Sequence, residues 1–218
     1  MNDITIIFLT INRVPEKWAE YHKSVLLEAI GDTPVITISK KPLDWGKVNL
    51  IQDKEPCVQQ IYEQILRAAK IATTPYIAIA EDDTLYHKDH FAFRPPLDTY
   101  AFEGHRWGLF TWGTPTYYWS DRISNGAMVA PRELAISSLE ERFERYPENN
   151  LGELGKEKGT KIDRKKSMIF YSNTAMIYLS HKGGLDPLES SRRKAMGKVQ
   201  AYRIPYWGEA KEVVQHFI

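Results

Sequence analysis

Three consecutive carboxylates, Glu81-Asp82-Asp83, are the residues of this sequence best suited to chemistry. They directly follow residues 76–80 (YIAIA), an apolar run typical of a buried strand in a parallel sheet. Adjacent carboxylates raise one another's pKa unless a cation neutralises them, and Mg²⁺ or Mn²⁺ takes oxygen ligands together with substrate phosphates. Ligands of open α/β sheets bind beyond the carboxyl ends of the strands. The triplet therefore predicts a cation and diphosphate site, with a solvated loop and helix cap as the structural alternative.

A second group of candidate residues follows the apolar run 175–179 (AMIYL). His181 could join Asp83 as a metal ligand, because imidazole nitrogen with carboxylate oxygen is a set that Mn²⁺ or Mg²⁺ accepts. Lys182 and the glycines after it could then approach the phosphates of a nucleotide closely. The alternative for His181 is a structural histidine at the end of a strand.

The surrounding sequence predicts the elements that must position these groups. Ile4–Thr10 and Val35–Ser39 are continuous, β-branched and apolar, so we expect two buried strands. Between them, apolar residues recur at helical spacing from Pro15 to Gly31, and residues 57–72 repeat the pattern. This order implies a parallel sheet with right-handed crossovers and thus an α/β fold.

The remaining elements are expected in the following ranges. They are an extended segment over 89–102, a strand over 107–112, an aromatic loop over 114–124, a strand over 125–130, helices over 132–146 and 148–158, a basic turn over 156–166 and a last strand over 175–179. Aromatic rings in the loop could stack on a sugar or a base, or could pack in the core.

Composition indicates an ordinary soluble globular protein of 218 residues, with 43% hydrophobic and 26% charged residues. Cys57 is the one cysteine, which excludes an internal disulfide and a cysteine-based zinc site and favours a reducing cytoplasm. The apolar run at the N-terminus is too short to span a membrane, and no basic region precedes it as in a signal peptide.

Residues 150–218 carry 13 Lys/Arg against 7 Asp/Glu, so the last part is basic and the remainder is acidic. That distribution suits a metal on one side of a site and an anionic substrate on the other.

The chain resembles the GT-A glycosyltransferases, which use nucleotide sugars and have a Rossmann-like sheet, over most of residues 4–182. ITIIFLTINR resembles the first strand and nucleotide loop of that family, and YIAIAEDD resembles the strand that carries its D-x-D-type motif. PENNLGELGKEKGTKI resembles the segment with the catalytic acidic pair, and AMIYLSH resembles the later strand that ends in a metal-ligating histidine.

The resemblance implies a role for each matching position. It implies Thr10, Asn12, Arg13 and Ser39 near the donor nucleotide, Glu81 or Asp82 at the ribose, Asp83 and His181 on Mn²⁺ or Mg²⁺, and Glu148 as the general base of an inverting transfer. Two positions depart from the family pattern: Glu81 stands where an aspartate is usual, and Asn149 stands where a second acid follows the base. Glu148 would also be favoured at a helix start by the helix dipole alone.

The resemblance also implies the organisation of the chain. Residues 1–182 would form the glycosyltransferase domain, with a nucleotide-binding half (1–90) and an acceptor half (91–182), and residues 183–218 would pack on it as a basic and aromatic segment. In that segment, HKGGLDPLESSRRKAMGK could grip nucleic-acid phosphates, and Tyr202, Tyr206 and Trp207 could stack on bases. A compact cytoplasmic enzyme of this kind is similar to phage enzymes that glycosylate hydroxymethylated pyrimidines in DNA.

Other acceptors and other activities stay open at this point. A surface glycan, a lipopolysaccharide core or a protein could accept the sugar. A nucleotidyltransferase also joins an α/β sheet to acidic metal ligands, but it would show a glycine-rich basic loop after the first strand, and TINRVPEK has no glycine. A non-catalytic module that binds carbohydrate or nucleic acid would explain the aromatic and basic residues but would leave Glu81 to Asp83 without a purpose.

Overall fold

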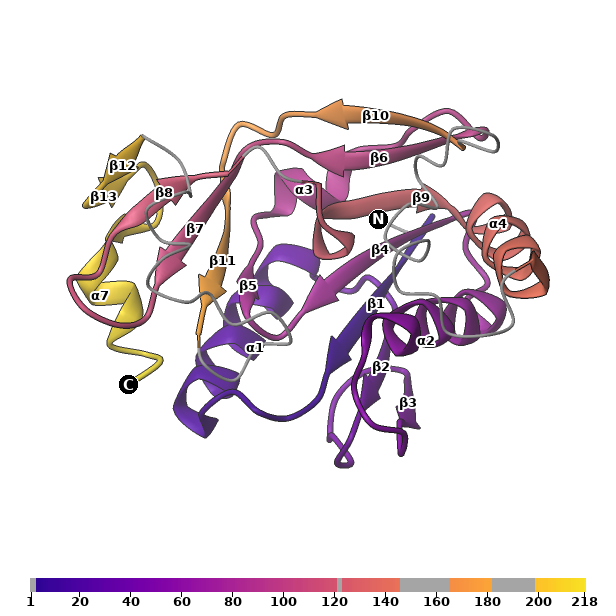
Figure 1. The fold of residues 1–218 in the computed structure, drawn as a ribbon, viewed down its shortest axis with the longest axis horizontal. Helices are drawn as coiled ribbons and strands as arrows, with labels where there is room; N and C mark the ends of the chain where they lie inside the picture. Colours follow the sequence, from indigo (N-terminus) through magenta and orange to yellow (C-terminus); the bar gives the residue numbers. More distant parts are fainter. Residues whose placement is uncertain (1–2, 121–122, 146–164, 182–198) are drawn as a thin grey trace.

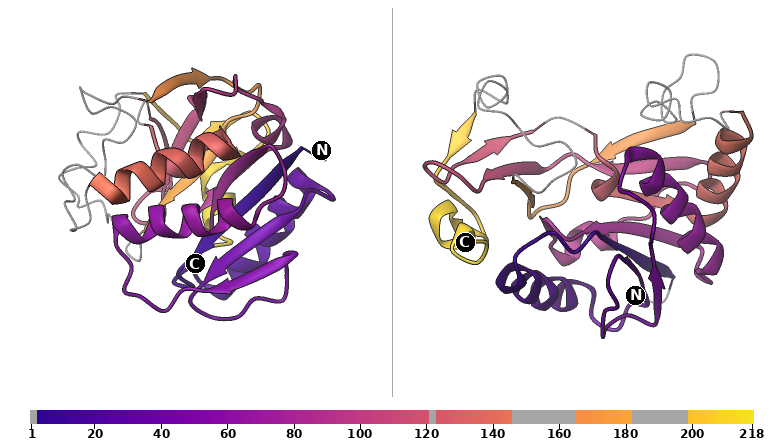
Figure 2. Two further views of the ribbon diagram at one scale, coloured as in Figure 1. Left: turned by 90° about the vertical axis from the view of Figure 1, so that its right-hand side faces the viewer. Right: turned by 60° about the horizontal axis from the view of Figure 1, so that its bottom comes forward.

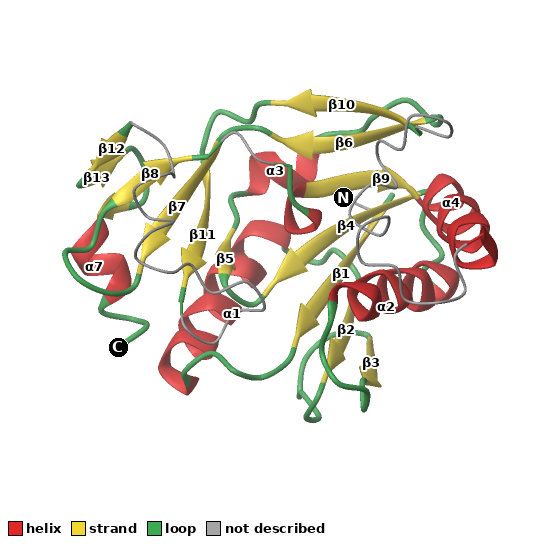
Figure 3. Ribbon diagram, in the orientation of Figure 1, coloured by secondary structure: helices red, strands yellow, loops and turns green. Residues whose placement is uncertain are grey.

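The computed structural model describes residues 3–120, 123–145, 165–181 and 199–218 (Figure 1). In these ranges the chain forms a seven-stranded sheet, a five-stranded sheet and a small two-stranded ribbon. Figure 3 shows the two larger sheets side by side, with α1 lying near the point where they meet. No helix of the described residues has the length and apolar composition needed to cross a membrane.

The elements have the following bounds. The larger sheet contains, in spatial order, β10 (Lys166–Phe170), β6 (Thr99–Glu103), β9 (Met128–Pro131), β4 (Tyr76–Glu81), β1 (Ile4–Thr10), β2 (Val35–Ser39) and β3 (Val48–Ile51). The smaller sheet contains β12 (Gln200–Ala201), β8 (Tyr117–Trp119), β7 (Arg106–Phe110), β11 (Met176–Ser180) and β5 (Thr84–Leu85), and the ribbon contains β13 (Arg203–Ile204) and β14 (Gly208–Glu209). The helices are α1 (Glu16–Ile30), α2 (Val58–Ile71), α3 (Lys88–Ala92), α4 (Arg132–Arg145) and α7 (Ala210–Val214), with a 3₁₀ turn η1 (Asn125–Ala127).

The larger sheet is mostly parallel and is covered on both faces. β3, β2, β1 and β4 run parallel, as do β6 and β10, and β9 alone among its strands is antiparallel to its neighbours. Ile7 of β1 packs in the core beneath α2 and α4, whereas Ile6 and Phe8 pack in the core beneath α1 and α3. Figure 2 shows α2 and α4 lying side by side over one face. Burial on both faces explains why the strands are continuous apolar runs, and the expected α/β fold class is confirmed.

The order of the strands defines a position for ligands. From β1 the chain passes through α1 to β2 on one side, and the return through α2 leads to β4 on the other side. The carboxyl ends of β1 and β4 therefore flank the switch point of the sheet, where open α/β folds bind their ligands. Gly31 ends α1 at a φ of 56°, a left-handed conformation that glycine adopts without strain.

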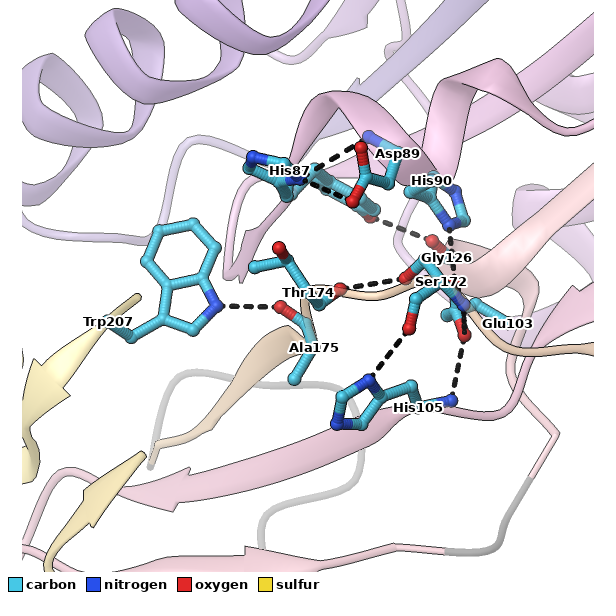
Figure 4. Close-up of polar contacts among 11 residues, drawn as sticks. His87, Asp89, His90, Glu103, His105, Gly126, Ser172, Thr174, Ala175 and Trp207 are labelled. Atoms are coloured by element: carbon cyan, nitrogen blue, oxygen red, sulfur yellow. Dashed lines mark hydrogen bonds and ion pairs between the residues drawn. The ribbon is translucent and has the colours of Figure 1, made fainter. Parts of the chain in front are cut away.

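A buried carboxylate fixes the point where two chain segments cross from the larger sheet to the smaller one. Glu103, at the end of β6, is 1% exposed and accepts hydrogen bonds from the backbone N–H of His105 (2.8 Å) and of Ser172 (3.1 Å) (Figure 4). His90 Nδ1 lies 3.8 Å from its other oxygen. Burial alone would raise the pKa of Glu103, but the nearby His90 imidazole and the hydrogen bonds from Ser172 and His105 outweigh it and lower the pKa. One side chain thereby ties the β6–β7 and β10–β11 connections together.

The C-terminal segment packs on the smaller sheet and on α1. Trp207 is 9% exposed and its indole Nε1 donates to the Ala175 carbonyl at 2.6 Å (Figure 4). The rings of Tyr21 and His216 stack with centroids 3.8 Å apart. The expectation that Trp207 stacks on bases is therefore wrong, because its ring fills the core; Tyr202 and Tyr206 are exposed.

Other expected elements also differ from the structure. The extended segment expected over 89–102 contains most of α3 and β6, and the expected aromatic loop contains β8. Tyr117 and Tyr118 of β8 are fully buried, so they are core residues and do not stack on a ligand. Strands β3 and β10, and β12 to β14 after the expected last strand, were not anticipated. The helix expected over 148–158 and most of the basic turn lie outside the described residues.

Candidate functional site

A cavity of about 210 Å³ opens at the switch point of the larger sheet. Its walls come from the ends of β1 and β4, the loop after β1, the start of α2, and the residue that follows β11. The lining residues are Leu9, Thr10, Ile11, Arg13, Val14, Ile38, Gln52, Pro56, Cys57, Gln60, Ile61, Gln64, Glu81, Asp82, Asp83 and His181. The cavity thus brings the predicted acidic triplet and the predicted histidine to one place.

Asp82, the middle residue of the triplet, is held by hydrogen bonds from β1 and α1. The Thr10 hydroxyl, at the end of β1, donates to Asp82 Oδ2. The Trp18 indole Nε1, from α1, donates to the Asp82 backbone carbonyl at 2.7 Å. Trp18 is itself fully buried, so the turn after β4 is anchored to the core. Asp82 consequently has one orientation relative to the end of β1.

The last carboxylate of the triplet faces the histidine. Asp83 Oδ2 lies 3.5 Å from His181 Nε2. The pairing of β5 with β11 enforces this proximity, and the Leu179 N–H donates to the Asp83 carbonyl at 2.8 Å. His181 is 6% exposed, and its ring lies against Phe217 with centroids 5.2 Å apart. The imidazole therefore has little freedom to turn away from Asp83.

Electrostatics at the triplet favour binding of a cation. Burial and, secondly, the negative charge of Asp83 together raise the pKa of the Asp82 carboxyl to about 7. The hydrogen bond from Thr10 and the positive charge available on His181 act in the opposite direction. A bound cation would remove the repulsion between the two aspartates and favour the ionised form of both.

Glu81 occupies a pocket of its own beside η1. A Cβ added at Gly126 would collide with the Glu81 carboxylate, so the absence of a side chain at Gly126 makes room for it. The Tyr86 hydroxyl accepts from the Glu81 N–H at 3.0 Å and donates to the Gly126 carbonyl at 2.8 Å. Glu81 thus has a defined place at the cavity edge, apart from the pair formed by Asp83 and His181.

The other predicted site residues divide into three groups. Arg13 is exposed and lines the cavity. Asn12 and Ser39 do not line it: Asn12 adopts a φ of 55° and its Oδ1 accepts from the Lys41 N–H at 2.8 Å, while the buried Ser39 hydroxyl donates to the Lys41 carbonyl at 2.6 Å. Both side chains hold the loops beside the cavity. Lys182 and Glu148 lie outside the described residues.

Four lining residues with polar side chains or a thiol were not predicted from the sequence. Gln52 follows β3, Cys57 precedes α2, and Gln60 and Gln64 are one turn apart on α2. The available signal was the i, i+4 spacing of two amides beside the apolar face of an amphipathic helix. Polar residues in such positions are commonly solvent-exposed, so the spacing alone did not distinguish them from surface residues.

The residues present fit a cation that the substrate helps to hold. Within the described part of the chain, no group of three or more His, Cys, Asp or Glu side chains is arranged to bind a metal. Asp83 and His181 supply two ligands, and Mg²⁺ or Mn²⁺ commonly takes one or two protein ligands together with water and substrate phosphates. The two aspartates, one with a raised pKa, give a physical reason for a cation at this position.

Comparison with solved structures identifies the fold. A glycosyltransferase involved in the glycosylation of the major capsid of PBCV-1 matches with a TM-score of 0.51 at 11% sequence identity, over 88% of this chain and 97% of that chain. This chain has a Rossmann-like α/β fold. At this level of identity the likeness shows the fold alone. No protein-family model and no curated protein matches the chain by sequence.

Two other solved enzymes are similar to a lesser degree. HddC from Yersinia pseudotuberculosis matches with a TM-score of 0.46 at 11% identity, over 82% of this chain and 93% of that chain. The 4-diphosphocytidyl-2C-methyl-D-erythritol synthase from Anaerococcus prevotii matches with a TM-score of 0.47 at 8% identity, over 88% of this chain and 92% of that chain. Both scores are too low to support an argument about this chain.

Proposed function

We propose that this protein is a metal-dependent glycosyltransferase that moves a sugar from a nucleoside-diphosphate sugar to an acceptor hydroxyl. The observation that carries the proposal is the meeting of Asp83 and His181, 3.5 Å apart, at the edge of a cavity beyond the carboxyl ends of β1 and β4. The Rossmann-like α/β fold of the chain is compatible with this activity. The metal and the donor remain proposals that rest on the chemistry of these side chains.

The roles of the binding residues follow from their positions. Asp83 and His181 would hold Mn²⁺ or Mg²⁺, which when bound supplies positive charge to the diphosphate leaving group. Asp82, oriented by Thr10, would accept hydrogen bonds from the ribose hydroxyls. Arg13 at the exposed rim would bind a phosphate oxygen through charge-assisted hydrogen bonds.

The transfer itself would be a direct displacement. The acceptor hydroxyl oxygen forms a bond to the anomeric carbon while the bond from that carbon to the diphosphate oxygen breaks, and the electron pair leaves with the diphosphate. The hydroxyl proton passes to a general base, for which we propose Glu148, and the anomeric configuration inverts. Lys182 would assist Arg13 in binding the leaving group.

Two classes of acceptor are proposed. DNA that carries hydroxymethylated pyrimidines is one proposed acceptor, and Tyr202 and Tyr206 still present exposed rings for base stacking. A glycan or protein acceptor is the alternative, and the PBCV-1 enzyme is involved in glycosylation of a capsid. A radioactive sugar donor distinguishes the two acceptor classes, because the label is transferred to DNA in one case and to a glycan or protein in the other.

A donor screen tests the proposal. Purified protein is incubated with each common nucleotide sugar in Mn²⁺ or in EDTA, and release of free sugar is measured; the best donor is then offered to hydroxymethylated DNA and to glycan and protein acceptors. We expect metal-stimulated sugar release that is lost in Asp83→Asn and kept in Asp44→Asn, which changes an exposed carboxylate paired with Lys23. Sugar release that is as high in EDTA, or in Asp83→Asn, as in the wild type with Mn²⁺ would refute the proposal. Formation of pyrophosphate from a nucleoside triphosphate and a sugar phosphate would instead identify a nucleotidyltransferase.

A further inference from the structure

One wall of the cavity is made of amide side chains. Gln52, Gln60 and Gln64 line it, and we call these three residues the glutamine wall. Gln52 is 6% exposed and Gln60 is 8% exposed. The Oε1 atom of each of the three is buried and accepts no hydrogen bond from any residue of the described ranges. A buried carbonyl oxygen without a donor is destabilising, so we expect a ligand at this wall to donate hydrogen bonds to it.

The orientation of the central amide is fixed from behind. Gln60 Nε2 donates to Glu63 Oε2 at 2.9 Å, and a carboxylate can only accept. Glu63 is itself held by Lys54 Nζ at 2.8 Å and by Gln59 Nε2 at 2.9 Å. Because the Gln60 nitrogen donates to Glu63, the oxygen is the atom of this amide that is free to accept a hydrogen bond. A ligand against this wall must therefore present hydrogen-bond donors.

The size and lining of the cavity limit the kind of ligand. About 210 Å³ is below the roughly 300–1,000 Å³ of pockets that enclose whole small molecules, so the cavity is too small to enclose a whole nucleotide sugar. Leu9, Ile38 and Ile61 supply apolar surface beside the glutamine wall, which suits a flat ring. The acidic triplet lines the same cavity and, under the proposed function, serves the ribose and the diphosphate. The base of the nucleotide is the part left for the glutamine wall.

We infer that the glutamine wall binds the base of the donor nucleotide and selects guanine; this rests on the proposed use of a nucleoside-diphosphate sugar. Guanine presents N1–H and one N–H of its exocyclic amino group side by side, next to a single carbonyl oxygen, O6, so two adjacent donors can face the wall. Uracil presents one N–H between two carbonyl oxygens, and those oxygens would face the amide oxygens unfavourably. Cytosine and adenine each present one amino group beside a ring nitrogen that accepts. Among these bases guanine satisfies the most oxygens of the wall.

The experiment compares binding of four nucleotides. GDP, UDP, CDP and ADP are titrated calorimetrically in Mn²⁺, and protection of Cys57 from a maleimide is measured in parallel, because this cysteine lines the same cavity. We expect GDP to bind at least tenfold more tightly than the other three and to protect Cys57. Gln60→Met keeps the size of the side chain but removes the acceptor, and we expect it to weaken GDP about tenfold while leaving UDP unchanged.

The matched control is Gln59→Met on the neighbouring position. Gln59 also donates to Glu63 but does not line the cavity, so this variant should keep the preference for GDP. Glu63→Gln should reduce the preference by freeing the Gln60 amide to turn, without loss of Mn²⁺-dependent binding. Gln64→Met repeats the test of the wall if Gln60→Met does not fold.

The outcomes separate this inference from the proposed function. Tight binding of UDP, CDP or ADP, or a GDP preference that survives both Gln60→Met and Gln64→Met, overturns the inference and leaves the glycosyltransferase proposal standing. Binding of none of the four diphosphates, with Cys57 unprotected, overturns both. A GDP preference that is lost in Gln60→Met and kept in Gln59→Met supports the inference.

Discussion

The Nε2 atom of His181 lies 3.5 Å from Oδ2 of Asp83, although the two residues belong to distant parts of the sequence. The register of β11 against β5 brings them together, because Ile177 pairs with Leu85 and the Leu179 N–H bonds to the Asp83 carbonyl. The smaller sheet thus positions His181, while Asp83 lies in the turn that leads from β4 of the larger sheet to β5. Each side of this pair can be tested separately.

Replacement of either ligand should remove activity without unfolding the protein. Asp83→Asn and His181→Gln preserve side-chain volume and hydrogen bonding but weaken the hold on a divalent cation. We expect turnover of the best nucleotide sugar to fall by about 100-fold or more in both, with melting temperatures close to that of the wild type. Asp44→Asn is the control on an exposed carboxylate. Wild-type turnover in either ligand variant would exclude this pair as the metal site.

Asp82→Asn should stabilise the protein in the absence of metal. Burial and the charge of Asp83 raise the pKa of Asp82, so the ionised carboxylate opposes folding at neutral pH. An asparagine can still accept from Thr10. In EDTA we expect the free energy of unfolding to rise by about 1–3 kcal/mol while sugar transfer falls, as sites strained for function commonly behave. Urea titration at pH 7.5 measures this, and a less stable variant would show that the carboxylate is not strained.

His22 should make the protein sensitive to acid. Its Nε2 lies 2.9 Å from the Thr84 carbonyl, so this nitrogen carries the proton in the neutral ring. Burial lowers the pKa of His22 from 6.5 to about 4, against the Thr84 hydrogen bond and the charge of Asp83. Between these pH values the unfolded chain binds a proton that the folded chain does not, so stability falls as the pH decreases. The loss at pH 4 amounts to about 3 kcal/mol.

The variant that isolates this effect is His22→Gln, whose amide can still donate to Thr84. We expect the unfolding free energy of the wild type to decrease relative to that of His22→Gln as the pH falls from 6.5 to 4. The raised pKa of Asp82 contributes with the opposite sign over an overlapping range, and this contribution is common to both proteins. A difference that is constant with pH would mean that His22 is protonated in the folded state.

Glu103→Ala should destabilise the junction of the two sheets. It would leave the N–H groups of His105 and Ser172 without their acceptor and would remove the partner of His90. We expect a loss of about 3–5 kcal/mol, the usual cost of removing one member of a buried polar pair. Glu103→Gln keeps an acceptor and should lose less, and Glu55→Gln, on an exposed carboxylate, should lose almost nothing. Equal stability of Glu103→Ala and the wild type would contradict the junction described here.

Much of the fold could be predicted because both faces of the larger sheet are buried. β1, β2 and β4 are uninterrupted apolar runs, and the helices between them repeat apolar residues every three or four positions. β3 was missed because its burial alternates along an edge of the sheet, and β10 because it is also an edge strand with exposed Met168 and Ile169. Short edge strands depend on their neighbours for pairing, which a local pattern does not contain.

The candidate site was predicted in part for a related reason. The acidic triplet and His181 each follow a strand, so their local sequence pointed to the edge of a sheet. No local sequence pattern indicated the glutamine wall, because Gln52 follows β3 whereas Gln60 and Gln64 lie on α2, and only the tertiary fold brings them to one cavity. For Tyr117 and Tyr118 the sequence left stacking on a ligand and packing in the core both open, and Trp207 was expected to stack on bases, because clustered aromatics look alike whether they face solvent or fill a core.

Manganese binding measured by electron paramagnetic resonance tests the central claim most directly. The signal of free Mn²⁺ is recorded as protein is added, with and without GDP or UDP, for the wild type and for Asp83→Asn. The account predicts that the wild type removes one equivalent of Mn²⁺ from solution when its preferred nucleoside diphosphate is present and that Asp83→Asn does not. Equal Mn²⁺ binding by the two proteins, or diphosphate binding by the wild type that is unchanged in EDTA, would contradict it.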